Sequence, residues 1–291
     1  MKRSQQVVVF LIFLISIGFV TPAFAAYHVS FVSDVARITA PTGNGLSCQG
    51  YVNIEGTSKL EQIWLCVRGP ADEVTTYPVN VIENAFQYEL SLRFGAGTYT
   101  IWVGDSSEHF DGNIRFEVTN TLNADLRYAA PSAYVDSKNE IVTQLSSSLV
   151  KPEMTDNEKL AAIYQWVTQN IAYDYNAYKE QANILKPASV IIQEKKGMCR
   201  DYSFTVAALA RASGLEARIV YGQARNGENG RTEYHAWNEV KLNGNWIFLD
   251  STWDAGYVKS GQFFRSPQLK FFNMESKGTS QTHQVEKITL H

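Results

Sequence analysis

The sequence predicts two domains, an all-β domain followed by an α+β domain. Residues from about 26 to 120 alternate short runs rich in Val, Ile, Tyr and Phe with clusters of turn-forming residues, which is typical of strands and loops. From residue 138 onward, apolar residues instead recur at helical spacing. The chain has 291 residues, of which 45% are hydrophobic and 19% charged, so it is long enough to bury two cores.

The first 25 residues have the features of a signal peptide. Lys2 and Arg3 form a positive start, residues 7–20 are continuously apolar, and Ala23-Phe24-Ala25 is a small-residue cleavage site before Ala26. An uncleaved anchor is the rival interpretation, but the apolar run is shorter than the roughly 20 residues that a spanning helix needs. We therefore expect a mature protein that begins at Ala26, has no membrane span, and is secreted or held in the cell envelope.

Residues 26–120 are expected to form a β-sandwich. The clearest part is residues 86–104, where two alternating strands flank Gly95-Ala96-Gly97. The spacing of strands and turns suits an immunoglobulin-like or fibronectin-like sandwich. His28 and His109 are isolated from other metal-ligating residues, so no catalytic or metal site is expected here. The domain is expected either to act as a spacer or to bind a cell-surface polymer or partner.

The chain has three cysteines, Cys48, Cys66 and Cys199. An odd number in an exported chain suggests that one thiol is free and reactive. Cys48 and Cys66 lie in two strand-like runs on either side of residues 56–58, and a hairpin centred on Thr57 would place them opposite one another. A disulfide between them and two buried free thiols are both compatible with this pattern, because disulfides between adjacent strands need favourable geometry.

Charge and composition give no indication of a nucleic-acid partner or a cofactor. The formal net charge is -3, with no run of Lys or Arg. The sequence has neither a calcium-binding loop of acidic residues nor paired Cys or His at zinc spacing. We expect a protein or peptide substrate, including substrates in the cell envelope, and the sequence does not give the oligomeric state.

Residues 121–137 are expected to be a linker, and residues 138–291 the second domain. Residues 139–149 form a predicted helix. Thr155 and Glu158 have the spacing of a capping box, in which two side chains satisfy the free N–H groups at a helix start. Apolar residues follow at helical spacing, which predicts a core helix: Leu160, Ile163, Tyr164, Val167 and Ile171.

Cys199 is expected at the N-terminal end of a helix. Residues 203–211 have helical periodicity, Gly197 precedes the helix, and Gly214 stands where a left-handed C-terminal cap is usual. The unpaired N–H groups and positive dipole at a helix start favour a thiolate. The backbone N–H of Cys199 would also point towards an oxyanion formed on a substrate.

His235 and Asp250 are predicted to meet across a hairpin. Asn243-Gly244 is a strong two-residue turn signal, and it pairs Leu242 with Asn245 and successive residues outward. This register places Trp237 opposite Asp250 and His235 opposite Thr252. His235 and Asp250 would then be diagonal neighbours about 7–8 Å apart at the backbone, within side-chain reach. Asp250 would accept a hydrogen bond from the imidazole and fix its tautomer.

These residues carry a resemblance to a known family. The ordered motifs are Gly197, Cys199, Asp201 and Tyr202, then His235, Ala236 and Trp237, then Asp250, Thr252 and Trp253. They resemble the transglutaminase-like superfamily of cysteine acyl-transfer enzymes, here in an exported bacterial-type form. The resemblance implies a papain-like core with Cys199 as nucleophile, His235 as base and Asp250 as orienting group. Ser251 stands where many relatives have proline, and nothing supports transferring the calcium of animal transglutaminases.

The resemblance implies an exported cysteine acyltransferase, similar to protein-glutamine gamma-glutamyltransferases. A thioester on Cys199 would pass its acyl group to an amine or to water. The same residues would serve a cysteine protease or amidase acting on peptide bonds. A catalytically silent binding or scaffolding module of the envelope is the third alternative.

The sequence also suggests roles for other residues near these motifs. Tyr173 and Gln193 are candidate donors to an oxyanion. The hypothesis for Trp237 is that it walls the approach to the thioester and restricts water, and the alternative is that both Trp237 and Trp253 pack the sheet, which is favoured more for Trp253. His283, near the end of the sequence, is expected to be a surface residue.

Overall fold

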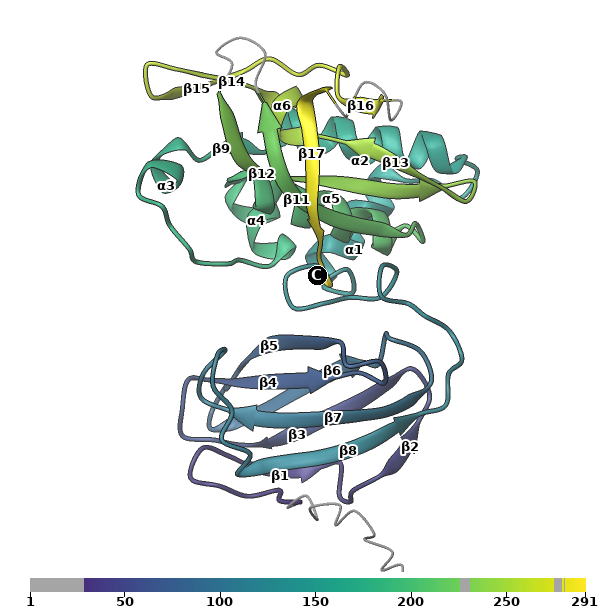
Figure 1. Ribbon diagram of the computed structural model, residues 1–291, viewed down its shortest axis with the longest axis vertical. Coiled ribbons are helices and arrows are strands. Elements are labelled where there is room, and N and C mark those ends of the chain that lie inside the picture. Colours follow the sequence, from purple (N-terminus) through teal and green to yellow (C-terminus); the bar gives the residue numbers. More distant parts are fainter. Residues whose placement is uncertain (1–28, 226–230, 275–278, 280) are drawn as a thin grey trace, which may run out of the picture.

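The computed structural model describes residues 29–225, 231–274, 279 and 281–291. The predicted signal peptide and its cleavage site lie outside these residues. Within the described part, none of the helices is both long and apolar enough to span a membrane. Figure 1 shows a lower region built of strands and an upper region of helices and strands.

The lower region consists of two antiparallel-rich sheets that share one core. Alternate residues of each strand point inward, as Val52 and Ile54 do in β3 and Leu65 and Val67 do in β4. One sheet has the order β1-β3-β6 and the other β2-β8-β7-β4-β5. The strands are β1 (Arg37–Ala40), β2 (Leu46–Cys48), β3 (Tyr51–Thr57), β4 (Gln62–Arg68), β5 (Val74–Asn80), β6 (Ala85–Ser91), β7 (Gly97–Gly104) and β8 (Ile114–Asn120). The expectation of an N-terminal all-β region is confirmed.

The expected hairpin centred on Thr57 is wrong. β3 pairs with β1 and β6, whereas β4 lies in the other sheet. Cys48 in β2 and Cys66 in β4 are separated within that sheet by β8 and β7, and both thiols are free. Strands in a sheet lie about 4.8 Å apart, so three spacings exceed the reach of a disulfide. Of the two alternatives, the structure therefore has two free thiols.

The upper region packs helices against a five-stranded sheet of order β16-β13-β12-β11-β17. Its helices are α1 (Glu140–Leu149), α2 (Asp156–Asn170), α3 (Tyr175–Lys179), α4 (Ala188–Glu194), α5 (Cys199–Ala212) and α6 (Ser251–Ala255). Its strands are β9 (Ala172–Tyr173), β10 (Lys196–Gly197), β11 (Ala217–Arg225), β12 (Thr232–Leu242), β13 (Asn245–Leu249), β14 (Gly256–Lys259), β15 (Gln262–Arg265), β16 (Phe272–Met274) and β17 (His283–Ile288). This is the α+β core that the sequence predicts.

Helices α1 and α2 begin where the sequence predicts, and side chains cap both starts. The Asn139 side chain accepts a hydrogen bond from the Ile141 N–H at the start of α1. Thr155 and Glu158 form the expected capping box on α2. Helix α5 packs against α1, α2, α4 and β12, and nearly all of its residues are buried. A helix that is surrounded in this way has a fixed position, so the residue at its start is fixed too.

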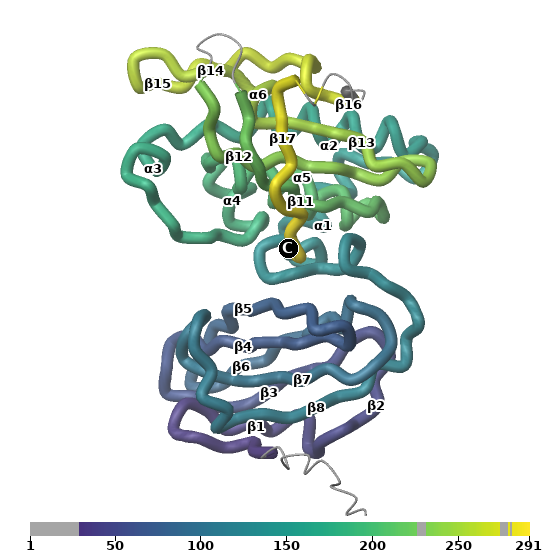
Figure 2. Tube along the Cα trace, viewed as in Figure 1, coloured from purple at the N-terminus to yellow at the C-terminus, as the bar shows by residue number. Residues whose placement is uncertain are grey.

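Strand β17 joins the edge of the sheet beside β11 and brings the end of the chain back to the junction of the two regions (Figures 1 and 2). The pairing requires glycine at position 222, because a Cβ atom there would lie 2.0 Å from the Gln284 carbonyl oxygen. Arg93 of the lower region donates to the carbonyl of Leu290, and Arg211 of α5 donates to the carbonyl of His291 at 2.6 Å. Both regions therefore hold the segment that follows β17.

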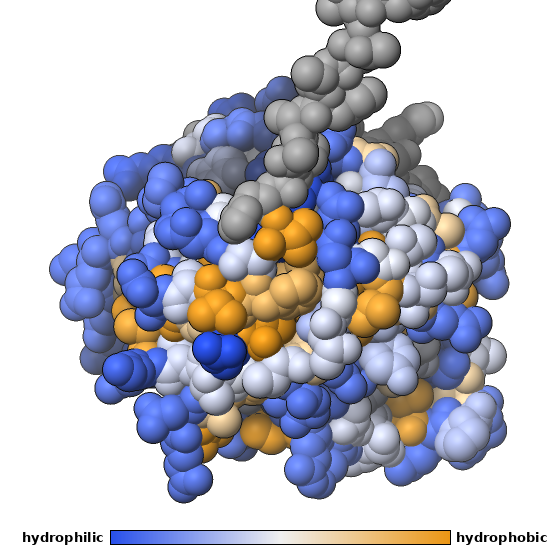
Figure 3. All heavy atoms as spheres, turned by 90° about the horizontal axis from the view of Figure 1, so that it is seen from below, coloured by the Kyte–Doolittle hydropathy of each residue, from blue (hydrophilic) through white to orange (hydrophobic). Residues whose placement is uncertain are grey.

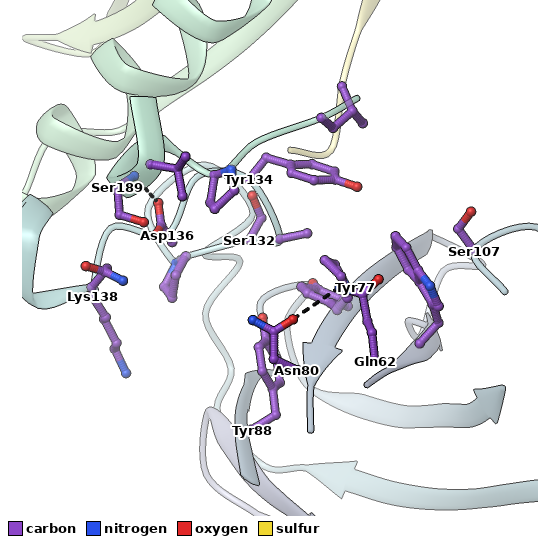
Figure 4. A pocket seen from close by; sticks show the side chains of 18 of the residues that line it. Gln62, Tyr77, Asn80, Tyr88, Ser107, Ser132, Tyr134, Asp136, Lys138 and Ser189 are labelled. Carbon is purple, nitrogen blue, oxygen red and sulfur yellow. Dashed lines mark hydrogen bonds between the residues drawn. The ribbon is translucent and has the colours of Figure 1, made fainter. Parts of the chain in front are cut away.

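A cavity of about 1040 Å³ lies between the two regions (Figure 4). Strands β4, β5 and β6 line one side, and the segments 131–139 and 183–190 line the other. Hydrogen bonds fix both walls, from Gln62 to Asn80 at 3.2 Å and from the Ser189 N–H to Asp136 at 3.1 Å. None of the three residues that resemble a catalytic triad lines this cavity.

Figure 3 views the molecule from below, onto the N-terminal region. Apolar residues gather near the middle of this face, and polar residues surround them. Val32 and Leu46 are among the exposed apolar residues of the region. An immunoglobulin-like class for this region, and its binding of a surface polymer or partner, stay predictions.

Candidate functional site

Cys199 is the first residue of α5, as the sequence predicts. The start of the helix is fixed by Asp201, whose carboxylate accepts a hydrogen bond from the Met198 N–H at 2.8 Å. Gly197 must be small, because a Cβ atom there would lie 2.5 Å from the Asp201 Cβ. Cys199 itself is half-buried. Its sulfur is thus accessible at the positive end of a rigid helix.

The hairpin that carries His235 and Asp250 has the predicted register where its two strands pair. Leu242 faces Asn245, and the ladder ends at Asn238 and Leu249. Asp250 then caps the start of α6, and its Oδ1 atom accepts hydrogen bonds from the N–H groups of Thr252 at 3.0 Å and Trp253 at 3.1 Å. The expected pairing of His235 with Thr252 is therefore wrong, because the chain turns into a helix after Asp250.

The side chains of His235 and Asp250 are in direct contact. His235 Nε2 lies 2.8 Å from Asp250 Oδ2, and both residues are buried. The Cys199 side chain also interacts with the ring, and this interaction raises the pKa of His235. Because Nε2 faces the carboxylate, Nδ1 is the ring nitrogen left for the sulfur. The structure thus brings Cys199, His235 and Asp250 together, although they lie on three different elements.

The electrostatics of the pair favour a charged histidine. Burial alone would lower the pKa of His235, but the Asp250 charge, its hydrogen bond and the Cys199 contact together raise this pKa to about 10. Burial likewise opposes the charged carboxylate, yet the charge of His235 and hydrogen bonds from His235 and His283 hold the pKa of Asp250 below its usual value. The imidazolium and the carboxylate therefore stabilise one another.

The backbone of Asp250 is fixed on both sides. Its N–H donates to the Phe271 carbonyl at 3.0 Å, and its carbonyl accepts from the Tyr164 hydroxyl at 2.8 Å. The Tyr164 hydroxyl also lies 2.7 Å from Asp254 Oδ2, which accepts from the Phe271 N–H at 2.8 Å. Helix α2 is thereby attached to the start of α6, so the core supports the carboxylate that faces His235.

Replacing Tyr164 with phenylalanine should destabilise the upper region. The change leaves the buried Asp254 carboxylate without one partner, and we expect a loss of about 1–3 kcal/mol in the free energy of unfolding. Chemical denaturation followed by tryptophan fluorescence measures this loss. Tyr257→Phe is the matched control, because Tyr257 is 55% exposed. Equal stability of the two variants would show that the Tyr164 hydroxyl does not support the site.

His283 is a site residue that the sequence interpretation missed. It is buried, not on the surface as expected, and its Nε2 atom lies 3.1 Å from Asp250 Oδ2. Its ring is surrounded by aromatic side chains, among them Trp237, Phe248 and Trp253. No spacing between residues 250 and 283 indicates this contact, which arises because β17 joins the sheet beside β11.

The candidate oxyanion donors differ in position. Tyr173 lies in β9, which pairs with β10 directly before Cys199. Burial, followed by the charge on Cys199, raises the pKa of Tyr173 above its usual value, so its hydroxyl keeps the proton that it would donate. Gln193 lies on an exposed part of α4. The role of either residue towards an oxyanion stays a prediction.

The two tryptophans differ in burial. Trp237 is buried in a cluster with Val220, Phe248 and Phe271, which agrees with the alternative in which it packs the sheet. Trp253 is only partly buried, and its ring stacks on His235 with a centroid distance of 5.3 Å. Trp253 therefore borders the imidazole more closely than Trp237, whose ring centroid lies 6.3 Å from that of His235.

One side-chain nitrogen or oxygen atom from each of His235, Asp250 and His283 lies within 4.8 Å of the other two. Imidazole and carboxylate are common ligands of zinc and other transition metals. Within the described residues, this group is compact enough to hold a metal ion, although the expectation from the sequence is that no metal is used.

Comparisons with known proteins match part of the chain. Residues 143–251 match the family model described as the transglutaminase-like superfamily. Kyphoscoliosis peptidase of Homo sapiens is 31% identical over 121 residues, which are 40% of this chain and 18% of that protein. The Mus musculus protein of the same name is 30% identical over 123 residues, 40% of this chain and 19% of that protein. This chain thus matches less than a fifth of the length of these curated relatives.

Two solved structures show more distant similarity. A candidate cysteine protease from Cytophaga hutchinsonii has a TM-score of 0.39 and 19% identity, covering 72% of this chain and 73% of that one. An arylamine N-acetyltransferase from Bacillus cereus, described as having a Cys-His-Glu triad, has a TM-score of 0.34 and 13% identity, covering 40% and 50%. The segment 143–251, which contains Cys199, His235 and Asp250, is thus the part of the chain that matches the transglutaminase-like superfamily model.

Proposed function

We propose that this chain is a cysteine-dependent acyl-transfer enzyme that forms a thioester on Cys199. The observation that carries the proposal is the position of His235, whose ring contacts both the Cys199 side chain and the buried Asp250 carboxylate. A charged imidazole beside a cysteine favours the thiolate, which is the nucleophilic form. Asp250 holds the imidazole in the orientation that this pairing needs.

The proposed reaction has two steps. The thiolate attacks the carbonyl carbon of an amide, and the Cys199 N–H at the start of α5 stabilises the resulting oxyanion. His235 donates its proton to the leaving nitrogen, the C–N bond breaks, and a thioester remains. An incoming amine or water then attacks the thioester and gives its proton to neutral His235. The C–S bond breaks and the thiolate is restored.

We propose protein-bound glutamine as the acyl donor and a primary amine as the preferred acceptor. Trp253 borders the imidazole and would shield the thioester on that side, which disfavours attack by water. The test incubates the protein with a fluorescent amine and a glutamine-rich protein, while ammonia release is followed. Amine incorporation with matching ammonia release is the expected result. Ammonia release without incorporation would contradict the preference for an amine.

Peptide-bond hydrolysis is the second candidate function. The human and mouse relatives are named peptidases, and the same nucleophile and base would serve an amide in the main chain. Incubation of the same protein substrate, followed by mass spectrometry for new peptide termini, distinguishes the two. Cleavage without amine incorporation would make the chain a protease. Neither product, with a Cys199 that reacts as an ordinary thiol, would favour a silent binding module of the envelope.

We also propose that the protein acts after export, with its N-terminus at Ala26. The support is the leader pattern of residues 1–25, which ends in Ala23-Phe24-Ala25. The intact mass of the protein recovered outside the cytoplasm gives its first residue. Recovery of the full-length chain in a membrane fraction would show an uncleaved anchor instead.

A further inference from the structure

We infer that His283 is a positioning residue that holds the Asp250 carboxylate in the orientation required by His235. The inference rests on the proposed function, because it assigns His283 to the same site. The rings of His283 and His235 pack with their centroids 5.9 Å apart. The hydrogen bond through which His283 would act is the one to Asp250.

The first argument is the hydrogen bonding of the carboxylate. Both oxygens of Asp250 are fully buried and have two partners each. Oδ1 accepts from the N–H groups of Thr252 and Trp253, and Oδ2 faces Nε2 of both His235 and His283. A carboxylate only accepts hydrogen bonds, so both imidazoles must donate from Nε2. Rotation of the carboxylate would break all of these contacts at once.

The second argument is that His283 is itself held rigidly. Its Nδ1 atom lies 2.8 Å from the hydroxyl of Thr282. Aromatic rings pack around it, with centroid distances of 4.6 Å to Trp253, 4.8 Å to Phe248 and 5.0 Å to Trp237. Its side chain is 1% exposed, so it does not contact a substrate. A fixed donor of this kind positions a carboxylate more effectively than mobile water would.

The third argument concerns the part of the reaction that His283 would affect. An orienting partner placed behind a catalytic group changes the rate of the chemical steps and leaves substrate binding largely unchanged. Removing the outer partner of a metal-binding side chain typically costs about 10- to 100-fold in affinity or activity, and we take the same range for a partner of the catalytic carboxylate. We therefore expect His283→Leu to lower kcat by about this factor with KM unchanged, since leucine fills the aromatic surroundings but donates no hydrogen bond.

The matched variant is His283→Gln, whose side-chain nitrogen can take the place of Nε2 as donor. We expect it to recover most of the kcat that His283→Leu loses. Circular dichroism and thermal unfolding confirm that both variants are folded. Equal losses of kcat in two folded variants would show that the ring packs the site without a role for its donor, and this would overturn the inference.

A second measurement needs no substrate. In protein with ¹⁵N-labelled histidine, the Nε2–H protons of His235 and His283 should both resonate downfield, as donors to one carboxylate. Asp250→Asn should shift both resonances, and His283→Leu should shift that of His235 while His283→Gln should shift it less. A His283 resonance that does not respond to Asp250→Asn would overturn the inference. Because these spectra are independent of activity, they separate failure of this inference from failure of the proposed function.

The rival role for the same residues is a metal site. Equilibrium dialysis with Zn²⁺ alone, followed by elemental analysis, tests it directly. We expect no stoichiometric binding by the wild-type protein. One equivalent of Zn²⁺ bound by the wild type and lost in both His283→Leu and His283→Gln would overturn the positioning role, because the metal would then occupy the space between Asp250 and the two rings.

Discussion

Replacing Cys199 with alanine should abolish amine incorporation and ammonia release. Without the sulfur no thioester forms, and the remaining donors can only polarise a bound amide, so we expect a loss of at least about 10³-fold. The change removes one half-buried atom at a helix start and should leave the fold intact. Fluorescent-amine incorporation and the near-UV circular dichroism spectrum measure the two effects.

The chain supplies its own controls for this substitution. Cys48 and Cys66 are also free thiols, and both lie in the lower region away from the site. Cys66→Ala should keep full activity and full modification of Cys199 by iodoacetamide. Residual activity of Cys199→Ala at the wild-type level would rule out the thioester mechanism.

Asp250→Asn should have the second-largest effect, a loss of about 10³- to 10⁴-fold in kcat/KM, as expected when an orienting carboxylate becomes an amide. The amide nitrogen would face either the two imidazole N–H groups or the N–H groups of Thr252 and Trp253. In each orientation the amide N–H groups would face other N–H groups in a buried site, and these donors would lose their acceptor. His235 would lose the interaction that keeps it charged, and iodoacetamide should modify Cys199 more slowly at pH 6.

The same substitution has a defined effect on stability as a function of pH. His235 has a raised pKa, so the stability that the pair contributes is complete below about pH 6.5, the usual histidine value, and is lost as the pH rises through about 10. Asp250 has a lowered pKa, so its contribution is complete above about pH 3.9 and is lost at lower pH. The difference in unfolding free energy between wild type and Asp250→Asn should therefore be largest between about pH 4 and 6.5.

Denaturant titrations across this pH range measure that difference. Asp72→Asn is the control, because the Asp72 side chain is 90% exposed and should leave stability unchanged. A difference for Asp250→Asn that is constant from acid to alkaline pH would show that the two charges are not coupled in the folded protein.

Local signals in the sequence predicted much of the site. The capping box of α2, the start of α5 at Cys199 and the turn at Asn243-Gly244 each depend on residues a few positions apart. The resemblance then supplied the one long-range step, the approach of α5 to the hairpin. The predicted hairpin pairing fails beyond Leu249. There Asp250 caps a helix and does not continue the strand.

The features that the sequence could not provide depend on pairing between distant segments. Alternation of apolar residues identifies a strand but not its neighbour, so β4 was expected beside β3 although it pairs with β5 and β7. The same limitation hid His283, whose contact with Asp250 depends on β17 lying beside β11. The alternation itself is present in the structure, where every second residue of β3 and β4 is buried.

The edge position of β17 has a consequence for local unfolding near the site. An edge strand has a neighbour on one side only, so it frays at a lower free energy than the strands within the sheet. If β17 opened, His283 would leave Asp250 while α5 and the inner strands stayed folded. The His283–Asp250 contact would then break as often as β17 opens, which amide-hydrogen exchange in β17 measures. It would break more often than the core unfolds.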